Sequence, residues 1–177
     1  MSVTLSDQEG IISNYMARDS KCGSAKSPLI ISGMSGQTIA LKIIDFGSEQ
    51  LDVDNRTISP SPYGYIQDGE ERTAFYGSLE RERFLYKSKT NEVALELEQN
   101  SDVPGFLLLY QKKGCSDLSP PMHAWYKRDG NQAVIGCEWS QKTWHLSCDG
   151  HSWSGVVGNC SEPGTVGGVY VHVCVCI

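Results

Sequence analysis

The stretch CDGHSWSGVVGNC (148–160) places a tryptophan and a run of small and polar residues between two cysteines. It could be a catalytic loop, a metal knuckle or the closing strap of a small disulfide module. Ser152 occupies the nucleophile position of a G-x-S-x-G elbow, but a serine replaces the second glycine and no strand-to-helix context surrounds it. His145, Cys148 and His151 suggest a zinc knuckle, but no fourth ligand is evident. We therefore favour a structural strap.

The distribution of cysteines supports disulfides over zinc. The 177-residue chain has seven cysteines, and six of them fall from Cys115 onward. Cys115, Cys137, Cys148 and Cys160 are widely spaced, unlike the C-x2-C pairs typical of zinc sites. Short cysteine-rich segments are typical of extracellular modules, where disulfides persist. Four cysteines allow three pairings, and their spacing does not choose between them.

Net charge, glycosylation sequons and the N-terminal sequence narrow the class of protein. The net charge is -6 and no run of Lys and Arg is present, which argues against a nucleic-acid partner. Sequons at Asn55 and Asn159 fit a glycoprotein of the secretory route. The first residues lack the basic start and apolar core of a signal peptide, so an extracellular location implies a fragment or a processed form.

Between Leu29 and Tyr110, short apolar or alternating runs are separated by turn signals. The runs that predict strands are LIISG, QTIALKIIDF, YGYIQDG, RTAFYGS, RFLYKS, NEVALELEQN and GFLLLYQ. NEVALELE contains good helix formers, but its apolar residues Val93, Leu95 and Leu97 alternate with polar ones, which favours a strand. Strands at this spacing predict an all-β sandwich. Its boundary is expected near QKKGCSDLSPP (111–121).

Several segments of the first 112 residues resemble those of a CUB domain, in the same order. They are GIISNY before Cys22, then YGYIQDG, FYGS and LEQNSDVPGFLLLYQ. The resemblance covers about residues 5–112 and implies a β-sandwich that recognises protein or glycan ligands. The family's second cysteine pair and the partner expected for Cys22 are both missing.

The resemblance also implies where calcium ligands would lie. By position they are Glu49, Gly64 and Asp102, so the middle carboxylate is absent. Calcium takes 6 to 8 oxygen ligands, and losing a carboxylate weakens such a site. We therefore expect no cofactor, with Glu49 and Asp102 as residual calcium candidates unless Asp52 or Asp54 supplies the third ligand.

Residues 114–161 are similar to a sushi (complement-control) module. The segment VIGCEWSQKTWHLSCDGHSWSG carries the likeness, with an apolar strand running into Cys137 and a D-G-x-W-S turn before the last cysteine. The resemblance implies pairing of Cys115 with Cys148 and of Cys137 with Cys160, with Trp153 filling the core between them. The expected domains are thus 1–112, CUB-like, and 113–161, a small disulfide-crosslinked sushi-like β module.

Residues 162–177 are expected to be a terminal strand or the start of a membrane segment that continues beyond Ile177. GGVYVHVCVCI is apolar but too short to cross a bilayer. Cys174 and Cys176 would share one face of a strand, and their pairing, like that of Cys22, stays open.

The sequence predicts a non-catalytic extracellular recognition or adhesion protein, either secreted or the ectodomain of a membrane receptor. No nucleophile, paired-acid or metal constellation with credible spacing is found, so we do not expect an enzyme. The alternative is the targeting region of a modular extracellular protease whose catalytic domain lies outside this chain. Trp125, Tyr126 and Arg128 form the candidate contact patch, because aromatic residues and arginine dominate interface hot spots. Packing of Trp125 within the module is the competing interpretation.

Overall fold

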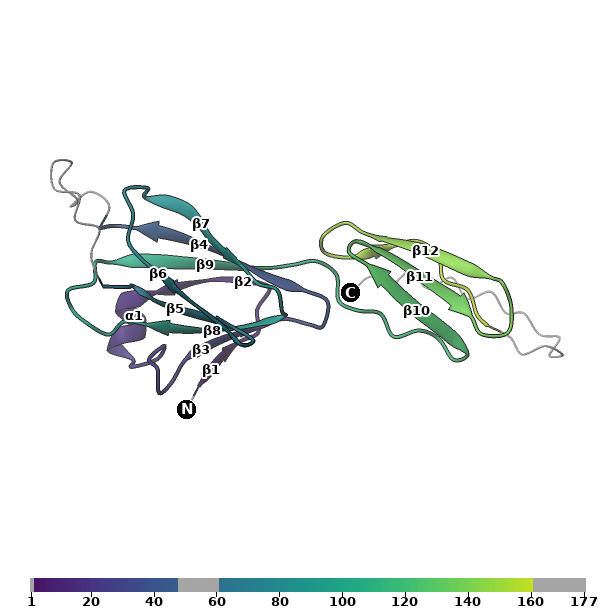
Figure 1. Cartoon of the computed structure of the whole chain (residues 1–177), viewed down its shortest axis with the longest axis horizontal. Helices are drawn as coiled ribbons and strands as arrows, with labels where there is room; N and C mark the ends of the chain where they lie inside the picture. Colours follow the sequence, from purple (N-terminus) through teal and green to yellow (C-terminus); the bar gives the residue numbers. More distant parts are fainter. Residues whose placement is uncertain (1, 48–60, 161–177) are drawn as a thin grey trace. The chain divides into compact units, whose positions relative to one another are not determined.

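The computed structural model describes residues 2–47 and 61–160 of the chain. It divides into a larger unit, Met1–Lys112, and a smaller unit, Lys113–Ile177 (Figure 1). The division lies between Lys112 and Lys113. Among the described residues, the regular elements are thirteen strands and one helix.

Two sheets form the larger unit. The first contains, in spatial order, β1 (Val3–Leu5), β3 (Leu29–Ser32), β8 (Glu92–Leu97), β5 (Gly64–Asp68) and β6 (Glu71–Phe75). The second contains β2 (Glu9–Ser13), β9 (Phe106–Lys113), β4 (Thr38–Asp45) and β7 (Glu82–Lys87). β1 runs parallel to β3, whereas β3, β8, β5 and β6 are antiparallel in succession. The predicted all-β sandwich is confirmed.

Each run that predicts a strand in the sequence forms one. In β8 the residues Val93, Leu95 and Leu97 are buried, as the alternation of NEVALELE predicts. Two short N-terminal strands, β1 and β2, and the helix α1 (Asn14–Asp19) were not predicted. α1 is too short to show an apolar helical period, and Asn14 and Ala17 are its buried residues.

An aromatic cluster and aliphatic side chains fill the space between the two sheets. The ring of Phe106 stacks on Tyr63 at 5.1 Å and meets Phe75 edge-on at 5.9 Å between centroids. The surrounding aliphatic side chains are almost fully buried: Ile31, Ile39, Leu41, Ile43, Ile66, Leu95 and Leu108. Burying each such side chain contributes roughly 1.5–3 kcal/mol. Among its described residues this unit has no disulfide, and Cys22 carries a free thiol.

Asn14 joins the start of α1 to the start of β9. Its amide nitrogen donates to the carbonyl oxygen of Pro104 at 2.9 Å, and its amide oxygen accepts from the backbone N–H of Phe106 at 2.9 Å. The side chain is 4% exposed, so both polar ends must be satisfied within the protein. The GIISNY and DVPGF segments are therefore neighbours in space, although they are far apart in sequence.

Asp68 fastens the β5–β6 turn to the segment that follows β7. Its carboxylate accepts hydrogen bonds from the backbone N–H groups of Lys89 at 2.6 Å and Thr90 at 3.2 Å, and from the hydroxyls of Tyr86 at 3.0 Å and Thr90 at 2.5 Å. Burial opposes ionisation of Asp68, but these four hydrogen bonds outweigh it and lower the pKa of the carboxyl. Burial and the bond to Asp68 raise the pKa of Tyr86 to about 12.

The smaller unit is one antiparallel sheet. Its strands are β10 (Ala124–Asp129), β11 (Gln132–Cys137), β12 (Thr143–Cys148) and β13 (Trp153–Ser154), in this order. Ala133, Ile135 and Leu146 form its small core, with Trp144 and Trp153 packed against it. In the part of the chain that the structure describes, no helix has the length and apolar composition of a membrane span.

The Asp68 network predicts a loss of stability in acid. Because its pKa is lower in the folded state, ionised Asp68 stabilises the larger unit above about pH 4, and this contribution disappears as pH falls through the folded-state pKa. Asp68→Asn should lower the free energy of unfolding by about 1–3 kcal/mol at pH 7 and flatten its decline between about pH 5 and 2. Amide hydrogen exchange of β5 and β8 in the full chain measures both effects. Asp19→Asn, at an exposed carboxylate, should change neither; an equal effect of both variants would contradict the prediction.

Candidate functional site

Two disulfides crosslink the smaller unit. They join Cys115 to Cys148 and Cys137 to Cys160, which are the pairs that the sushi resemblance implies. Cys137 ends β11 and Cys148 ends β12, so the bridges tie the sheet to the segments on both sides of it. Their sequence separations are 33 and 23 residues, and loop closure of this size contributes roughly 3–4 kcal/mol per bridge.

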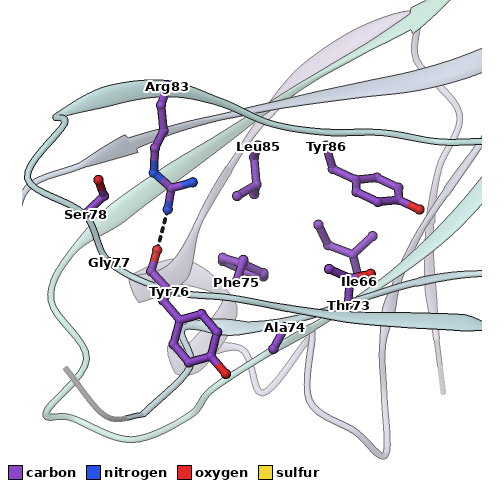
Figure 2. Close-up of a pocket in the computed structure, with 10 residues that line it drawn as sticks. All are labelled: Ile66, Thr73, Ala74, Phe75, Tyr76, Gly77, Ser78, Arg83, Leu85 and Tyr86. Atoms are coloured by element: carbon purple, nitrogen blue, oxygen red, sulfur yellow. Dashed lines mark hydrogen bonds between the residues drawn. The ribbon is translucent and has the colours of Figure 1, made fainter. Parts of the chain in front are cut away.

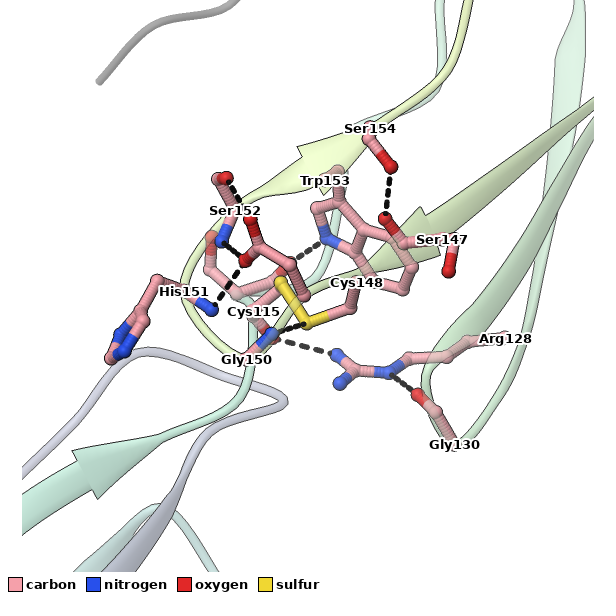
Figure 3. The surroundings of a disulfide bond; sticks show 12 residues. Cys115, Arg128, Gly130, Ser147, Cys148, Gly150, His151, Ser152, Trp153 and Ser154 are labelled. Atoms are coloured by element: carbon pink, nitrogen blue, oxygen red, sulfur yellow. Dashed lines mark hydrogen bonds between the residues drawn. A yellow bond between two sulfur atoms is a disulfide. The ribbon is translucent and has the colours of Figure 1, made fainter.

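The strap at residues 148–160 begins with a tight turn (Figure 3). The carboxylate of Asp149 accepts from the backbone N–H groups of Ser152 at 2.8 Å and His151 at 2.9 Å, and from the Ser152 hydroxyl at 3.1 Å. These bonds favour the ionised form and lower the pKa of Asp149. Gly150 has φ of 105°, a conformation that favours glycine. Ser152 closes this turn, and Cys148 lies in a disulfide, so the thiolate that zinc requires is not available.

Trp153 and Arg128 hold the first cysteine segment against the sheet. The Trp153 indole N–H donates to the carbonyl oxygen of Ser116 at 2.7 Å. The guanidinium of Arg128 lies 5.1 Å from the centroid of the Trp153 ring and donates to the Cys115 carbonyl oxygen at 2.9 Å and to Asp117 at 2.7 Å. The strap is therefore a structural element, and Arg128 of β10 packs against its Trp153 (Figure 3).

The three residues of the predicted contact patch are not on one surface. Burial alternates along β10, so Tyr126 and Arg128 lie on the inner face of the strand and Trp125 lies on the outer face. Tyr126 packs against the small core, and its hydroxyl is buried without a hydrogen-bond partner in the part of the chain that the structure describes. Grouping the three residues by their closeness in sequence was wrong, because a strand sends successive side chains to opposite sides. Trp125 alone remains at a solvent-facing position.

Trp125 lies across Gly136 on the outer face of the sheet. The two residues are paired in register, and a Cβ atom at position 136 would overlap the indole ring. Glycine therefore leaves room for the indole to lie against the backbone, while Trp125 stays 42% exposed. The next cross-strand row places Lys127, Val134 and His145 on the same face.

A second exposed tryptophan lies at the same end of the β10–β11 pair. Trp139 follows β11 and is 55% exposed, and its ring centroid is 6.2 Å from that of His123, which precedes β10. The Glu138 N–H donates to the carbonyl oxygen of His123 at 3.0 Å and closes this end of the ladder. Met122 is 80% exposed beside it. We call Met122, His123, Trp125 and Trp139 the aromatic end.

Sequence reasoning missed Trp139 as an exposed candidate residue for a contact. The available signal was its position in EWSQK, a polar turn between two predicted strands, where a core tryptophan is not expected. Trp144 and Trp153, by contrast, lie on strands and pack against the core.

Of the residual calcium candidates, Asp102 lies among the described residues. Glu49, Asp52 and Asp54 lie outside them. The Asp102 carboxylate is approached by Asn100 and Ser101 of its own turn, each at 3.4 Å. A Cβ atom at Gly64 would overlap the carbonyl oxygen of Glu96 and the ring of Phe75, so β5 has no room for a side chain at the middle position. Within the described ranges, no three His, Cys, Asp or Glu side chains gather as a metal site.

The predicted glycosylation and C-terminal positions are partly described. Asn159 is exposed, next to the disulfide-bonded Cys160. Asn55, Cys174 and Cys176 lie outside the described residues, as does the segment 162–177 that contains the last two.

A groove in the larger unit was not predicted. It has a volume of about 350 Å³ and opens between β6 and β7 (Figure 2). Ile66, Phe75 and Leu85 are its apolar lining, and the Arg83 side chain lies at one end. The groove arises where the edges of two sheets meet, which no local sequence pattern reveals.

Comparison with models of known protein families gives no match, and a search of curated proteins gives no significant match either. The function must therefore be argued from the residues and their arrangement.

The disulfides should be needed for folding of the smaller unit but not of the larger unit. Complete reduction should unfold it, because removing bridges of this kind typically costs about 2–5 kcal/mol each in a small domain. The larger unit should stay folded, since its described residues contain no disulfide. All four tryptophans lie in the smaller unit, so a red shift of their fluorescence reports on it, and the β4 amide NMR signals report on the sandwich. Unchanged fluorescence after full reduction would contradict this prediction.

Proposed function

We propose that the chain is a non-catalytic recognition protein of the extracellular space, in which a CUB-like sandwich precedes a sushi-like module. The aromatic end of the smaller unit is its contact surface for a protein or glycan partner. The observation that carries the proposal is the exposure of Trp125 and Trp139 at one end of a sheet whose other two tryptophans are packed inside.

The crosslinked unit supports an extracellular setting. Disulfides persist in oxidising compartments and are rare in the cytosol. Both bridges belong to a unit whose described residues include three buried apolar core residues besides the cysteines, so the fold depends on the bridges. The exposed Asn159 sequon is consistent with passage through the secretory route.

The aromatic end has the chemistry of a contact surface. Exposed tryptophans are costly to leave in water, and they are enriched among the residues that contribute most to binding. Trp125 is held against Gly136 and adopts a position fixed by the sheet, so little conformational entropy is lost when a partner covers it. Lys127 and His145 on the same face, and Glu138 beside Trp139, offer polar groups for the rim of such a contact.

The residues that the sequence offers as a candidate nucleophile or zinc ligand have structural roles in the strap. The Ser152 hydroxyl and the Asp149 carboxylate bind each other in the strap turn, and Cys148 is bonded to Cys115. Binding without catalysis is therefore the function that the smaller unit supports best.

The double substitution Trp125→Ala and Trp139→Ala should strongly weaken recognition without unfolding the chain. Fluorescently labelled protein, secreted from eukaryotic cells, is assayed by flow cytometry on a panel of cell lines and on a glycan array. We expect saturable binding by the wild type and at least about a tenfold loss in the double variant, because a hot-spot tryptophan contributes about 2 kcal/mol or more.

Phe84→Ala is the matched control, since Phe84 is an exposed aromatic residue of the larger unit. It should bind like the wild type. If the wild type binds no surface in either assay the proposed function fails, and if the double variant binds normally the aromatic end is not the contact surface.

A further inference from the structure

The groove between β6 and β7 lies where both sheets of the sandwich end. β6 is the last strand of the five-stranded sheet and β7 is the last strand of the four-stranded sheet. The consecutive residues 73–78 line one wall, and Arg83, Leu85 and Tyr86 of β7 line the other. Figure 2 shows Arg83 at one end of the groove, Phe75 and Leu85 facing one another in the middle, and Tyr86 at the other end.

The first wall is suited to an extended backbone. A wall made of consecutive residues exposes the main chain as well as alternate side chains, because successive side chains of a strand point in opposite directions. The outer edge of a terminal strand presents N–H and C=O groups that pair readily with another extended segment. Peptide recognition by strand addition uses such an edge for affinity and neighbouring pockets for specificity.

Arg83 gives the groove a charged end. Its Nη2 donates to the carbonyl oxygen of Tyr76, while its Nε is buried and has no hydrogen-bond partner among the described residues. A guanidinium has five N–H donors in a planar fork, and a carboxylate is the group that matches this fork. An acidic group at this end of the groove can accept hydrogen bonds from the guanidinium of Arg83, which lines the groove.

The separation of the Arg83 and Leu85 side chains on β7 indicates which positions of a peptide ligand would contact them. Arg83 and Leu85 are two residues apart on one strand and both line the groove, so their side chains project about 7 Å apart. In an extended peptide, residues two apart have the same separation on one face. The cavity volume of about 350 Å³ lies at the lower end of ligand sites, which suits two side chains.

From these observations we infer that the groove binds an extended peptide segment of a partner protein, in which an acidic residue is followed two positions later by an apolar residue. The acidic side chain contacts Arg83, the apolar side chain lies between Phe75 and Leu85, and the peptide backbone pairs along the edge of β6. This site is independent of the aromatic end and of the function proposed for it.

The test is an NMR titration of the full chain, labelled with ¹⁵N. The probes are two blocked peptides, acetyl-Thr-Glu-Thr-Val-Thr-amide and its glutamine counterpart acetyl-Thr-Gln-Thr-Val-Thr-amide. We expect saturable shifts of β6 and β7 amides with the glutamate peptide, and about tenfold weaker binding of the glutamine peptide, as loss of a charge-assisted hydrogen bond predicts.

Arg83→Met should reduce the affinity for the glutamate peptide to that for the glutamine peptide. Arg72→Met is the matched control, because Arg72 lies on β6 but binds Glu96 and Tyr65 away from the groove. Should Arg83→Met fail to fold, Arg83→Lys retains the charge without the fork and is expected to bind the glutamate peptide several-fold more weakly. Equal affinity for the two peptides, shifts elsewhere on the protein, or full affinity in the folded Arg83 variant would each overturn the inference.

Discussion

The smaller unit depends on its two disulfides because its apolar core is too small to hold it folded. Among its described residues, three apolar residues besides the cysteines are buried there, and a domain of this size buries too little surface to offset the entropy of its chain. Cys115–Cys148 and Cys137–Cys160 supply the missing constraint. Trp144 and Trp153 pack against this core, whereas Trp125 and Trp139 are exposed to solvent.

The larger unit offsets the entropy of its chain by burying apolar side chains, without a disulfide among its described residues. Its two sheets enclose a continuous core around Phe106, and buried polar residues connect segments that the core does not reach. Asn14 ties α1 to β9, and Asp68 ties the β5–β6 turn to the chain after β7. The sandwich is not closed into a barrel, so it has sheet edges. The groove at β6 and β7 is a consequence of that open edge.

Regular alternation made the strands of the larger unit predictable from sequence. NEVALELE, for example, has one buried face whatever its neighbours are. What could not be predicted depends on contacts across the chain. α1 is fixed by the bonds of Asn14 to a segment 90 residues away, and the groove by two strands from different sheets. The disulfide pairing needed the likeness to a known module, because spacing alone allowed three pairings.

The candidate contact residues show a further limit of prediction from short stretches of sequence. Trp125 and Arg128 both belong to AWYKRD, yet the strand period sends one outward and the other into the strap, where it holds the Cys115 carbonyl. Trp139 joins the exposed surface only because the ladder end at His123 brings its loop beside β10.

The two candidate surfaces, the aromatic end and the groove, would bind partners by different physical interactions. Binding by exposed indoles depends on removing apolar area from water and responds little to salt, whereas a contact to Arg83 depends on charge and weakens as ionic strength rises. Salt dependence therefore separates recognition by the aromatic end from recognition by the groove in any partner found for this protein.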